Sequence, residues 1–147
     1  MNYLQAFAIS ASGMAVEKAR VDLTAVNIAN AQSTRSADGA GIRPLRLLTA
    51  AKTAPDFPSL LAGASAGIAS RLQGAEIVGV TELAAPPRLV YEPGHPDADD
   101  KGFVAYPGIN PLAEMVNLLI SVRVYEANVA ALNAAKSMAL RTLQIGG

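Results

Sequence analysis

The sequence predicts a mainly α-helical fold with a small β insert. Apolar residues recur at helical spacing near both ends of the chain, over residues 1–31 and 110–147. The segment between them, residues 32–109, contains eight of the nine prolines and nine of the twelve glycines, the residues that interrupt helices. We therefore expect an N-terminal and a C-terminal helix that pair as an antiparallel coiled coil, with a short β-hairpin domain between them.

The N-terminal helix, residues 1–31, carries a heptad seam, which is a line of mostly apolar residues separated alternately by three and four positions. The seam consists of Leu4, Phe7, Ala11, Met14, Lys18, Val21, Ala25 and Ile28, with Lys18 as its one polar member. Alanine and aliphatic residues also occupy the other sides of this helix. A helix that is apolar nearly all round is expected to be buried on several sides.

The insert, residues 32–109, predicts short strands joined by loops. Residues 50–70 are rich in Ala, Gly, Pro and Ser, a composition typical of a flexible loop. Residues 75–81 and 88–91 are expected to form a hairpin around Pro86 and Pro87, and residues 102–106 to add a strand. Residues 42–48 are a weaker strand candidate because Pro44 lies within them.

The C-terminal helix has a well-marked beginning and end. Asn110 can cap it, Pro111 suits the first helical position, and Gly146 and Gly147 suit its stop. Its heptad seam consists of Met115, Leu118, Val122, Tyr125, Val129, Leu132, Lys136, Ala139 and Leu143. If the two helices pair along one stripe each, apolar side chains on their other sides stay uncovered. We expect this uncovered surface to contact other chains.

Composition excludes several classes of protein. The 147 residues are 51% hydrophobic and 16% charged, with no cysteine and no net charge, so disulfides and thiolate chemistry are excluded and no global field attracts nucleic acid. No stretch reaches the roughly 18 apolar residues of a membrane span, so we expect that the hydrophobicity is not transmembrane. The first residues lack the basic start of a secretory signal, so any export is expected to use a route that does not cleave a signal.

His95 is the only histidine and lies close to Asp97, Asp99 and Asp100. A metal site or a small metal-dependent enzyme using His95 and Asp97 is one interpretation, but the spacing fits no EF-hand and too few nitrogen or sulfur ligands are present for zinc. The preferred interpretation is a tight turn over residues 93–97, which are rich in proline and glycine.

No other pattern favours an enzyme. The chain has no phosphate-binding loop and no nucleophile elbow. Lys18 and Lys136 are expected to extend toward solvent from the seams rather than act as bases. The helix asparagines are expected to make hydrogen bonds between helices or between subunits that set the register; they are Asn27, Asn30, Asn128 and Asn133. A peripheral membrane binder is disfavoured because the helix charges are nearly balanced.

Three motifs resemble the axial proteins of the bacterial flagellum. Ser12-Gly13-Met14 followed by Asn27-Ile28-Ala29-Asn30 resembles the N-terminal signature of rod, hook and hook-associated subunits, and Tyr125-Glu126-Ala127-Asn128 resembles the terminal helix of rod proteins. The segment 89–99, with Gly102-Phe103-Val104, Pro107 and residues 134–141, is similar to the C-type proximal rod subunits, which Thr34-Arg35 also fits. The chain departs from that family before Pro86, near residues 42–44, at Gly108 and at Pro111.

This resemblance implies a structural subunit of the proximal rod without cofactor, metal or catalytic residues. It implies export through the flagellar type III apparatus and assembly into the periplasm-crossing axle that transmits torque to the hook. The implied partners are copies of itself, other rod subunits, the base of the rod near the membrane ring and the export apparatus, with no nucleic acid and no membrane span. A different axial subunit of the same superfamily is the alternative. The expected assembly interface comprises Leu4, Phe7, Met14, Val21, Asn27, Ile28, Asn30, Met115, Leu118, Val122, Tyr125, Asn128, Val129, Leu132, Asn133 and Leu143.

Overall fold

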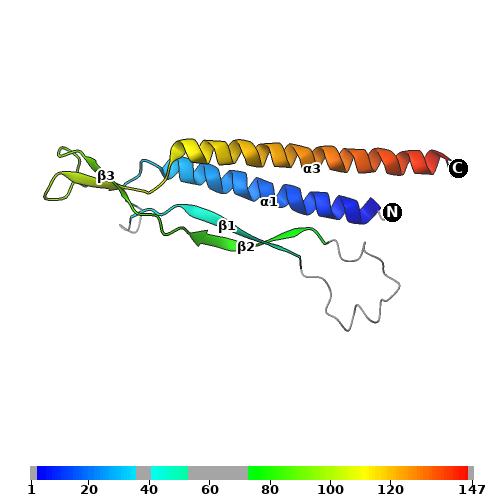
Figure 1. Cartoon of the computed structure of the whole chain (residues 1–147), viewed down its shortest axis with the longest axis horizontal. Helices are drawn as coiled ribbons and strands as arrows, with labels where there is room; N and C mark the ends of the chain where they lie inside the picture. Colours follow the sequence, from blue (N-terminus) through cyan, green and yellow to red (C-terminus); the bar gives the residue numbers. More distant parts are fainter. Residues whose placement is uncertain (1–2, 36–40, 53–72, 146–147) are drawn as a thin grey trace, which may run out of the picture. The chain divides into compact units, whose positions relative to one another are not determined.

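The computed structural model describes residues 3–35, 41–52 and 73–145. The elements follow one another as α1 (Tyr3–Asn30), β1 (Leu45–Ala51), β2 (Ala75–Glu82), β3 (Arg88–Tyr91), β4 (Phe103–Tyr106) and α3 (Pro111–Ile145) (Figure 1). Helices α1 and α3 contain 28 and 35 residues, so the prediction of a mainly helical chain with a small β insert is confirmed. The loop predicted over residues 50–70 lies almost entirely outside the described residues, as do Gly146 and Gly147.

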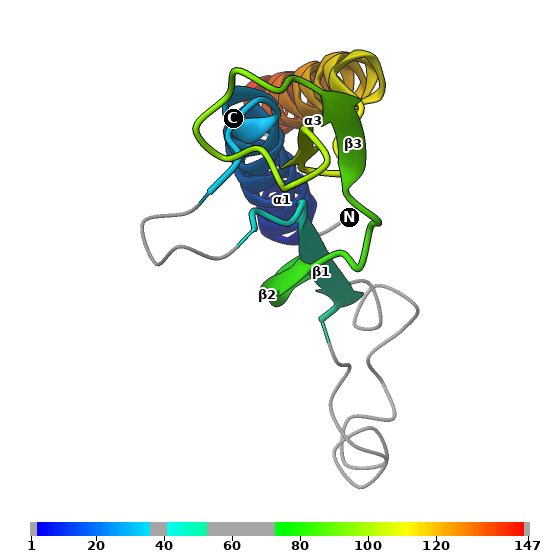
Figure 2. The same ribbon diagram turned by 90° about the vertical axis from the view of Figure 1, so that its left-hand side faces the viewer.

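The strands form two separate two-stranded sheets, one of β1 and β2 and one of β3 and β4 (Figure 2). The predicted strands at 75–81, 88–91 and 102–106 are present, but the predicted hairpin between the first two is wrong. Strand β3 instead pairs antiparallel with β4, with Arg88 opposite Tyr106 and Tyr91 opposite Phe103. Pro86 and Pro87 lie between β2 and β3 in a segment without regular structure, and the tight turns that close the β3–β4 hairpin lie in residues 92–102.

The contacts divide the chain into two compact units, and each combines parts of both helices with part of the insert. The first unit contains residues 1–19, 49–78 and 121–147, and the second contains residues 20–48 and 79–120. The predicted division of the chain into the segments 1–31, 32–109 and 110–147 stays a prediction.

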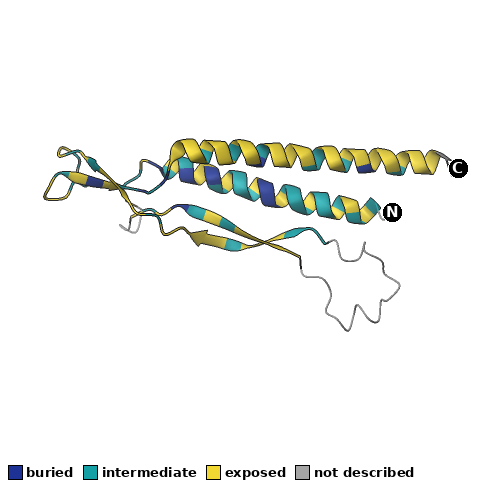
Figure 3. Cartoon of the chain, viewed as in Figure 1, coloured by how far each residue is buried: buried dark blue, intermediate teal, exposed yellow. Residues whose placement is uncertain are grey.

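The predicted heptad seams are not confirmed by the burial of the helices, because their residues are half-buried or exposed. Figure 3 shows that most of α3 is exposed. In α1 the buried residues include Glu17, Thr24 and Asn27, and in α3 they are Ser121 and Ala135. The predicted seam positions Leu4, Met115 and Leu143 are 77%, 51% and 73% exposed. The fully buried positions thus include several small or polar residues next to the predicted seams, together with Val16. The large apolar seam residues are half-buried or exposed.

Candidate assembly surface and the contacts that shape it

In the first unit the helices approach closely at Gly13 of α1 and Asn128 of α3. A β-carbon at residue 13 would lie 2.9 Å from Asn128 Oδ1 and 3.1 Å from its Cγ. The Asn128 amide donates to the Val124 carbonyl one turn earlier in α3 at 2.9 Å. Nearer the chain ends, the hydroxyls of Tyr3 and Thr142 share a hydrogen bond of 3.1 Å. Since residue 3 lies near 142 and residue 13 near 128, the two helix segments of this unit run antiparallel.

The same unit uses Ser12, the neighbour of Gly13, to fix the beginning of β2. The Ser12 hydroxyl donates to the Ile9 carbonyl at 2.7 Å and accepts the backbone N–H of Ala75 at 3.1 Å. Gly74 has a φ of +72° and lies so close to Ser12 that a β-carbon there would collide with the Ser12 hydroxyl. A left-handed glycine is therefore required at this junction.

In the second unit Asn27 joins α1 to β1 and to α3. Its side chain accepts the Leu45 N–H at 2.8 Å and donates to the Leu45 carbonyl at 2.9 Å, as a neighbouring strand would. The same amide nitrogen donates to Glu114 Oε2 at 3.1 Å. Asn27 is 4% exposed. The expected interhelical hydrogen bond is thus present at Asn27, inside the subunit.

Helix α3 begins with the predicted cap. Asn110 Oδ1 accepts the backbone N–H groups of Leu112 at 3.1 Å and Ala113 at 3.3 Å, while Pro111 occupies the first helical position. Glu114 in the first turn adds a negative charge where the helix dipole favours one. Glu114 also accepts a hydrogen bond from Asn27. The Asn110 cap and the contact with α1 therefore both stabilise the first turn of α3.

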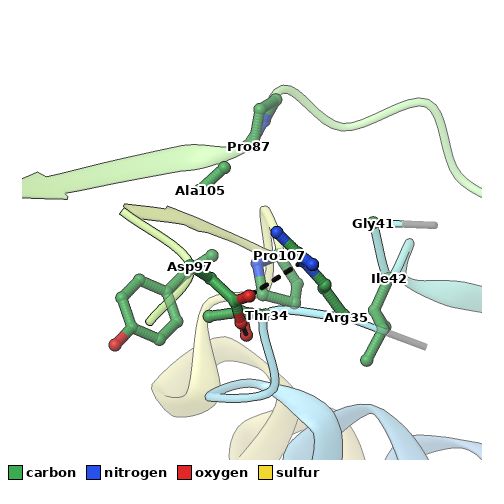
Figure 4. A pocket seen from close by; sticks show the side chains of 9 residues that line it. Thr34, Arg35, Gly41, Ile42, Pro87, Asp97, Ala105 and Pro107 are labelled. Carbon is green, nitrogen blue, oxygen red and sulfur yellow. Dashed lines mark hydrogen bonds and ion pairs between the residues drawn. The ribbon is translucent and has the colours of Figure 1, made fainter. Parts of the chain in front are cut away.

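Asp97 ties the chain after α1 to the β3–β4 connection in the second unit (Figure 4). Thr34 Oγ1 donates to Asp97 Oδ2 at 2.6 Å, and Arg35 Nε lies 2.9 Å from Asp97 Oδ1. These residues line a pocket of about 310 Å³ that also includes Ile42, Pro87, Ala105, Tyr106 and Pro107. The Asp97 carboxylate is therefore engaged within the subunit, by the ion pair with Arg35 and the hydrogen bond from Thr34.

His95 lies in the predicted turn, which the structure confirms. The Nδ1 atom of its imidazole accepts the Asp97 backbone N–H at 3.0 Å, and the backbone N–H of His95 donates to the Glu92 carbonyl at 3.0 Å. Asp99 Oδ1 accepts the N–H groups of Lys101 and Phe103 at 2.9 and 2.8 Å. The carboxylate of Asp99 therefore stabilises the next bend of the hairpin connection.

Tyr106 of β4 lies in a charged environment within the second unit. Its hydroxyl donates to Glu92 Oε2 at 3.0 Å, and the Arg88 guanidinium lies over its ring at 5.5 Å. The hydrogen bond to Glu92 raises the pKa of Tyr106 above its usual value, with burial and the Glu92 charge adding to the effect and Arg88 opposing it. The phenol is thus held in its neutral, donating form.

Two of the departures from the resembled family touch one another. A β-carbon at Gly108 would collide with the Pro86 carbonyl and lie 2.9 Å from the Ala85 Cβ. Both positions are among the departures expected from the resemblance, and the small side chains at both allow this approach. No local sequence pattern indicates that the two positions meet.

Large apolar side chains remain exposed on the described elements. On α3 the exposed set comprises Leu112, Met115, Val116, Leu119, Ile120, Val124, Tyr125, Met138, Leu140 and Leu143. On the strands it includes Ile77, Val78, Val80, Leu89, Tyr91 and Phe103. Monomeric proteins rarely expose so many large apolar residues on neighbouring turns, so these faces are candidate contacts with other chains.

The predicted interface residues differ in how far the subunit itself covers them. Leu4, Met115, Tyr125, Asn133 and Leu143 are exposed, and Asn27 is buried. The others are half-buried, namely Phe7, Met14, Val21, Ile28, Asn30, Leu118, Val122, Asn128, Val129 and Leu132. The predicted interface does not include Leu112 and Ile120, which are exposed apolar side chains of α3. It also leaves out Leu119, although the sequence places Leu119 on a second apolar line of this helix.

Two other interpretations concern metals and membranes. Within residues 3–35, 41–52 and 73–145, no group of three or more His, Cys, Asp or Glu side chains is placed to hold a metal ion. Residues 111–144 of α3 are long and apolar enough to cross a membrane by length and composition alone, and only 6% of the most apolar window is buried. The prediction that no stretch is apolar enough for a membrane span is therefore wrong for α3 by length and composition. A helix that packs against neighbouring subunits has the same composition.

Comparison with known proteins identifies the family. Residues 100–145 match the family described as flagellar basal body rod FlgEFG protein C-terminal. The sequence is 38% identical over 146 residues to the flagellar basal-body rod protein FlgC of Escherichia coli O6:H1, and 37% identical to that of Salmonella typhimurium, with 99% of each chain covered. It is 36% identical over 141 residues to FlgC of Bacillus subtilis, with 94% of each chain covered.

These relatives and the exposed apolar faces of the terminal helices define a structural subunit of the bacterial flagellar basal-body rod. The chain belongs to the FlgC family of flagellar basal-body rod proteins. Its location is therefore the rod of the basal body, where it assembles with other rod subunits.

Proposed function

We propose that this chain is a proximal rod subunit whose helices α1 and α3 form part of the rod wall by coiled-coil packing against neighbouring subunits. The observation that carries this proposal is that large apolar side chains are exposed on α3 while polar side chains are buried between the elements. Glu17, Asn27 and Ser121 are buried inside the subunit, whereas Leu119 and Leu143 are 63% and 73% exposed. An apolar seam that points outward is suited to contacts made only on assembly.

The proposal includes the route and the mechanical role. The subunit travels unfolded through the flagellar type III apparatus and folds where it assembles, in the axle that crosses the periplasm and transmits torque to the hook. A subunit that completes its packing only against neighbours suits such a route, because little of its stability is required before assembly. Its neighbours are copies of itself, other rod subunits and the base of the rod near the membrane ring.

The expected assembly residues stay a proposal, refined by their exposure. Leu4, Met115, Tyr125, Asn133 and Leu143 are available to a neighbour in the isolated subunit. Residues that are half-buried, such as Val129, contribute to both the subunit and its contacts. Substitution of an exposed residue therefore separates assembly from folding better than substitution of Val129.

The decisive experiment changes Leu119 to aspartate in cells that lack the native gene. Because Leu119 is exposed, Leu119→Asp should change the free energy of unfolding by less than about 0.5 kcal/mol. The variant should be exported at the normal level but be absent from purified basal bodies, and the cells should not swim. Gln32→Glu adds the same charge at an exposed polar residue and should assemble normally.

Normal swimming by the Leu119→Asp cells would contradict the use of the outward face in the rod wall. A different axial position is tested by complementation. The unaltered chain should restore basal bodies in its own deletion strain and not in strains that lack another rod subunit. Restoration of a different strain alone would assign the chain to that other position.

A further inference from the structure

The β3–β4 hairpin has apolar residues on both faces, and its one charged strand residue, Arg88, lies on the inner face opposite Tyr106. The register pairs Leu89 with Ala105 and Val90 with Val104, and side chains alternate between faces along a strand. The inner face contains Val104, which is fully buried, and the half-buried Val90 and Tyr106. The outer face consists of Leu89, Tyr91, Phe103 and Ala105, all exposed. A sheet with one solvated face is normally polar on that face, so this composition indicates a surface that another chain covers.

The two aromatic residues of the outer face are fixed in place before any partner binds. The rings of Tyr91 and Phe103 pack edge to face with centroids 5.4 Å apart. Gly102 has a φ of +79°, and a β-carbon there would lie 2.9 Å from the Tyr91 ring. Tyr91 remains 64% exposed. A rigid, exposed aromatic pair is the kind of anchor that contributes most of the energy at protein interfaces.

The charges of the hairpin select the partner surface. Residues 88–106 carry a net charge of −2, from Arg88 and Lys101 against Glu92, Asp97, Asp99 and Asp100. Arg35 already pairs with Asp97. Asp99, which accepts the Phe103 N–H, and the following residue Asp100 are both exposed. The partner surface is therefore expected to be apolar and to carry a positive charge at its edge.

The second half of α3 has this chemistry, and the first half does not. Leu140 and Leu143 are 52% and 73% exposed, and Lys136 precedes them at the spacing that places all three on one side of a helix. Residues 121–145 carry a net charge of +2, from Arg123, Lys136 and Arg141 against Glu126. Residues 111–120 are equally apolar, but Glu114 is their single charge.

We propose that the outer face of the β3–β4 hairpin binds the C-terminal half of α3 of a second copy of this chain. The aromatic pair contacts Leu140 and Leu143, and Lys136 lies against the carboxylates of Asp99 and Asp100. The contact joins different surfaces of the two copies, so repeating it generates a ring or an open helix of subunits instead of a closed dimer. This inference rests on the proposed rod function, and it names the surfaces through which copies meet.

Crosslinking between two populations tests the contact, because the chain contains no cysteine. Cells should express one copy with Tyr91→Cys and another with Leu140→Cys, each with a different tag. Treatment of purified basal bodies with a short bis-maleimide should yield a dimer that carries both tags. Neither variant alone should yield one. As a control, Ala134→Cys is exposed and lies half a turn around the helix from Leu143, so it should not link to Tyr91→Cys.

Basal bodies that contain both variants but yield no mixed dimer would overturn this contact while leaving the rod function intact. Linkage of Tyr91→Cys to Ala134→Cys as efficient as to Leu140→Cys would also overturn it. A charge exchange decides the matter if the cysteine variants do not incorporate. Lys136→Glu should lower incorporation about tenfold or more, and Asp100→Lys in the same chain should restore most of it. Absence of restoration would refute the contact.

Discussion

Gly13 of α1 and Asn128 of α3 are in direct contact: a β-carbon added at residue 13 would lie 2.9 Å from the Asn128 Oδ1. Both residues belong to the motifs that resemble flagellar axial proteins, one near each end of the chain. The contact gives these motifs a physical reason, since only glycine allows the Asn128 amide to lie on α1 while it donates to the Val124 carbonyl.

Replacement of Gly13 by alanine should be harmful only while Asn128 is present. Alanine in a helix interior is favoured over glycine by about 0.5–1 kcal/mol. In the native background this gain should be cancelled or reversed, because the new methyl group displaces Asn128. In an Asn128→Ala background Gly13→Ala should stabilise the protein. Urea denaturation of the four variants measures the coupling, which should be about 1–2 kcal/mol; additive effects would contradict the contact.

Asn27→Asp should destabilise the protein by about 3 kcal/mol or more near neutral pH, because the oxygen that replaces the amide nitrogen would face Glu114 and the Leu45 carbonyl without a donor. Burial and the Glu114 charge raise the pKa of the new carboxyl above its unfolded value near 3.9. The folded state then binds the proton more tightly than the unfolded state. The deficit is therefore smallest below about pH 3.9 and grows as the pH rises through the raised folded value.

Thermal unfolding followed by circular dichroism from pH 3 to 8 measures this dependence. Asn133→Asp makes the same chemical change at an exposed residue of α3 and should shift the free energy of unfolding by less than about 0.5 kcal/mol. Equal effects of the two substitutions would show that Asn27 does not join the three segments.

Gly108→Ala should destabilise the second unit by about 1–3 kcal/mol, because the methyl group would meet the Pro86 carbonyl and the Ala85 side chain, which cannot rotate away. Gly94→Ala is the matched control, since no atom lies within 4 Å of a β-carbon at residue 94. Equilibrium denaturation of both variants measures the difference. Equal stability of the two would show that residues 85–86 do not approach residue 108.

The phenol of Tyr106 should titrate above the usual tyrosine value near 10, and Glu92→Gln should lower its pKa toward that value. Arg88→Ala should have the opposite effect, because the Arg88 charge lowers this pKa. Since the folded pKa is raised, the contribution of Tyr106 to stability is complete below pH 10 and is lost as the pH rises through the folded value. NMR titration with tyrosine-selective carbon labels measures it, and an unchanged pKa in Glu92→Gln would contradict the role of that hydrogen bond.

Local signals in the sequence predict the elements well. Asn110 and Pro111 mark the start of α3 through their own chemistry, and β3 falls on residues 88–91 as predicted. Strand pairing was harder, because β1 begins directly after Pro44 and its partner β2 lies beyond a long connection. Proline within the candidate at 42–48 hid a strand that continues to Ala51, past the end of the candidate.

The orientation of the helices was not predictable from apolar spacing alone. Two adjacent heptad lines run along α1, an apolar one through Leu4 and Met14 and a polar one through Glu17 and Asn27. Hydrophobicity favours the first as the interior. The structure buries the second because Asn27, Gly13 and Ser12 are used by α3 and by the strands. Which side of α1 is buried therefore depends on contacts between residues that are distant in the sequence, and a local pattern cannot predict such contacts.

Ser12 and Asn27 fix the insert at two strand beginnings, Ala75 and Leu45, and the Lys52 N–H closes onto the Gly74 carbonyl at 3.0 Å. The chain between residues 52 and 74 therefore leaves and returns at a hydrogen-bonded pair. Because both ends are held by these hydrogen bonds, a change in the number of residues between 52 and 74 is expected to leave the contacts of Ser12 and Asn27 in place.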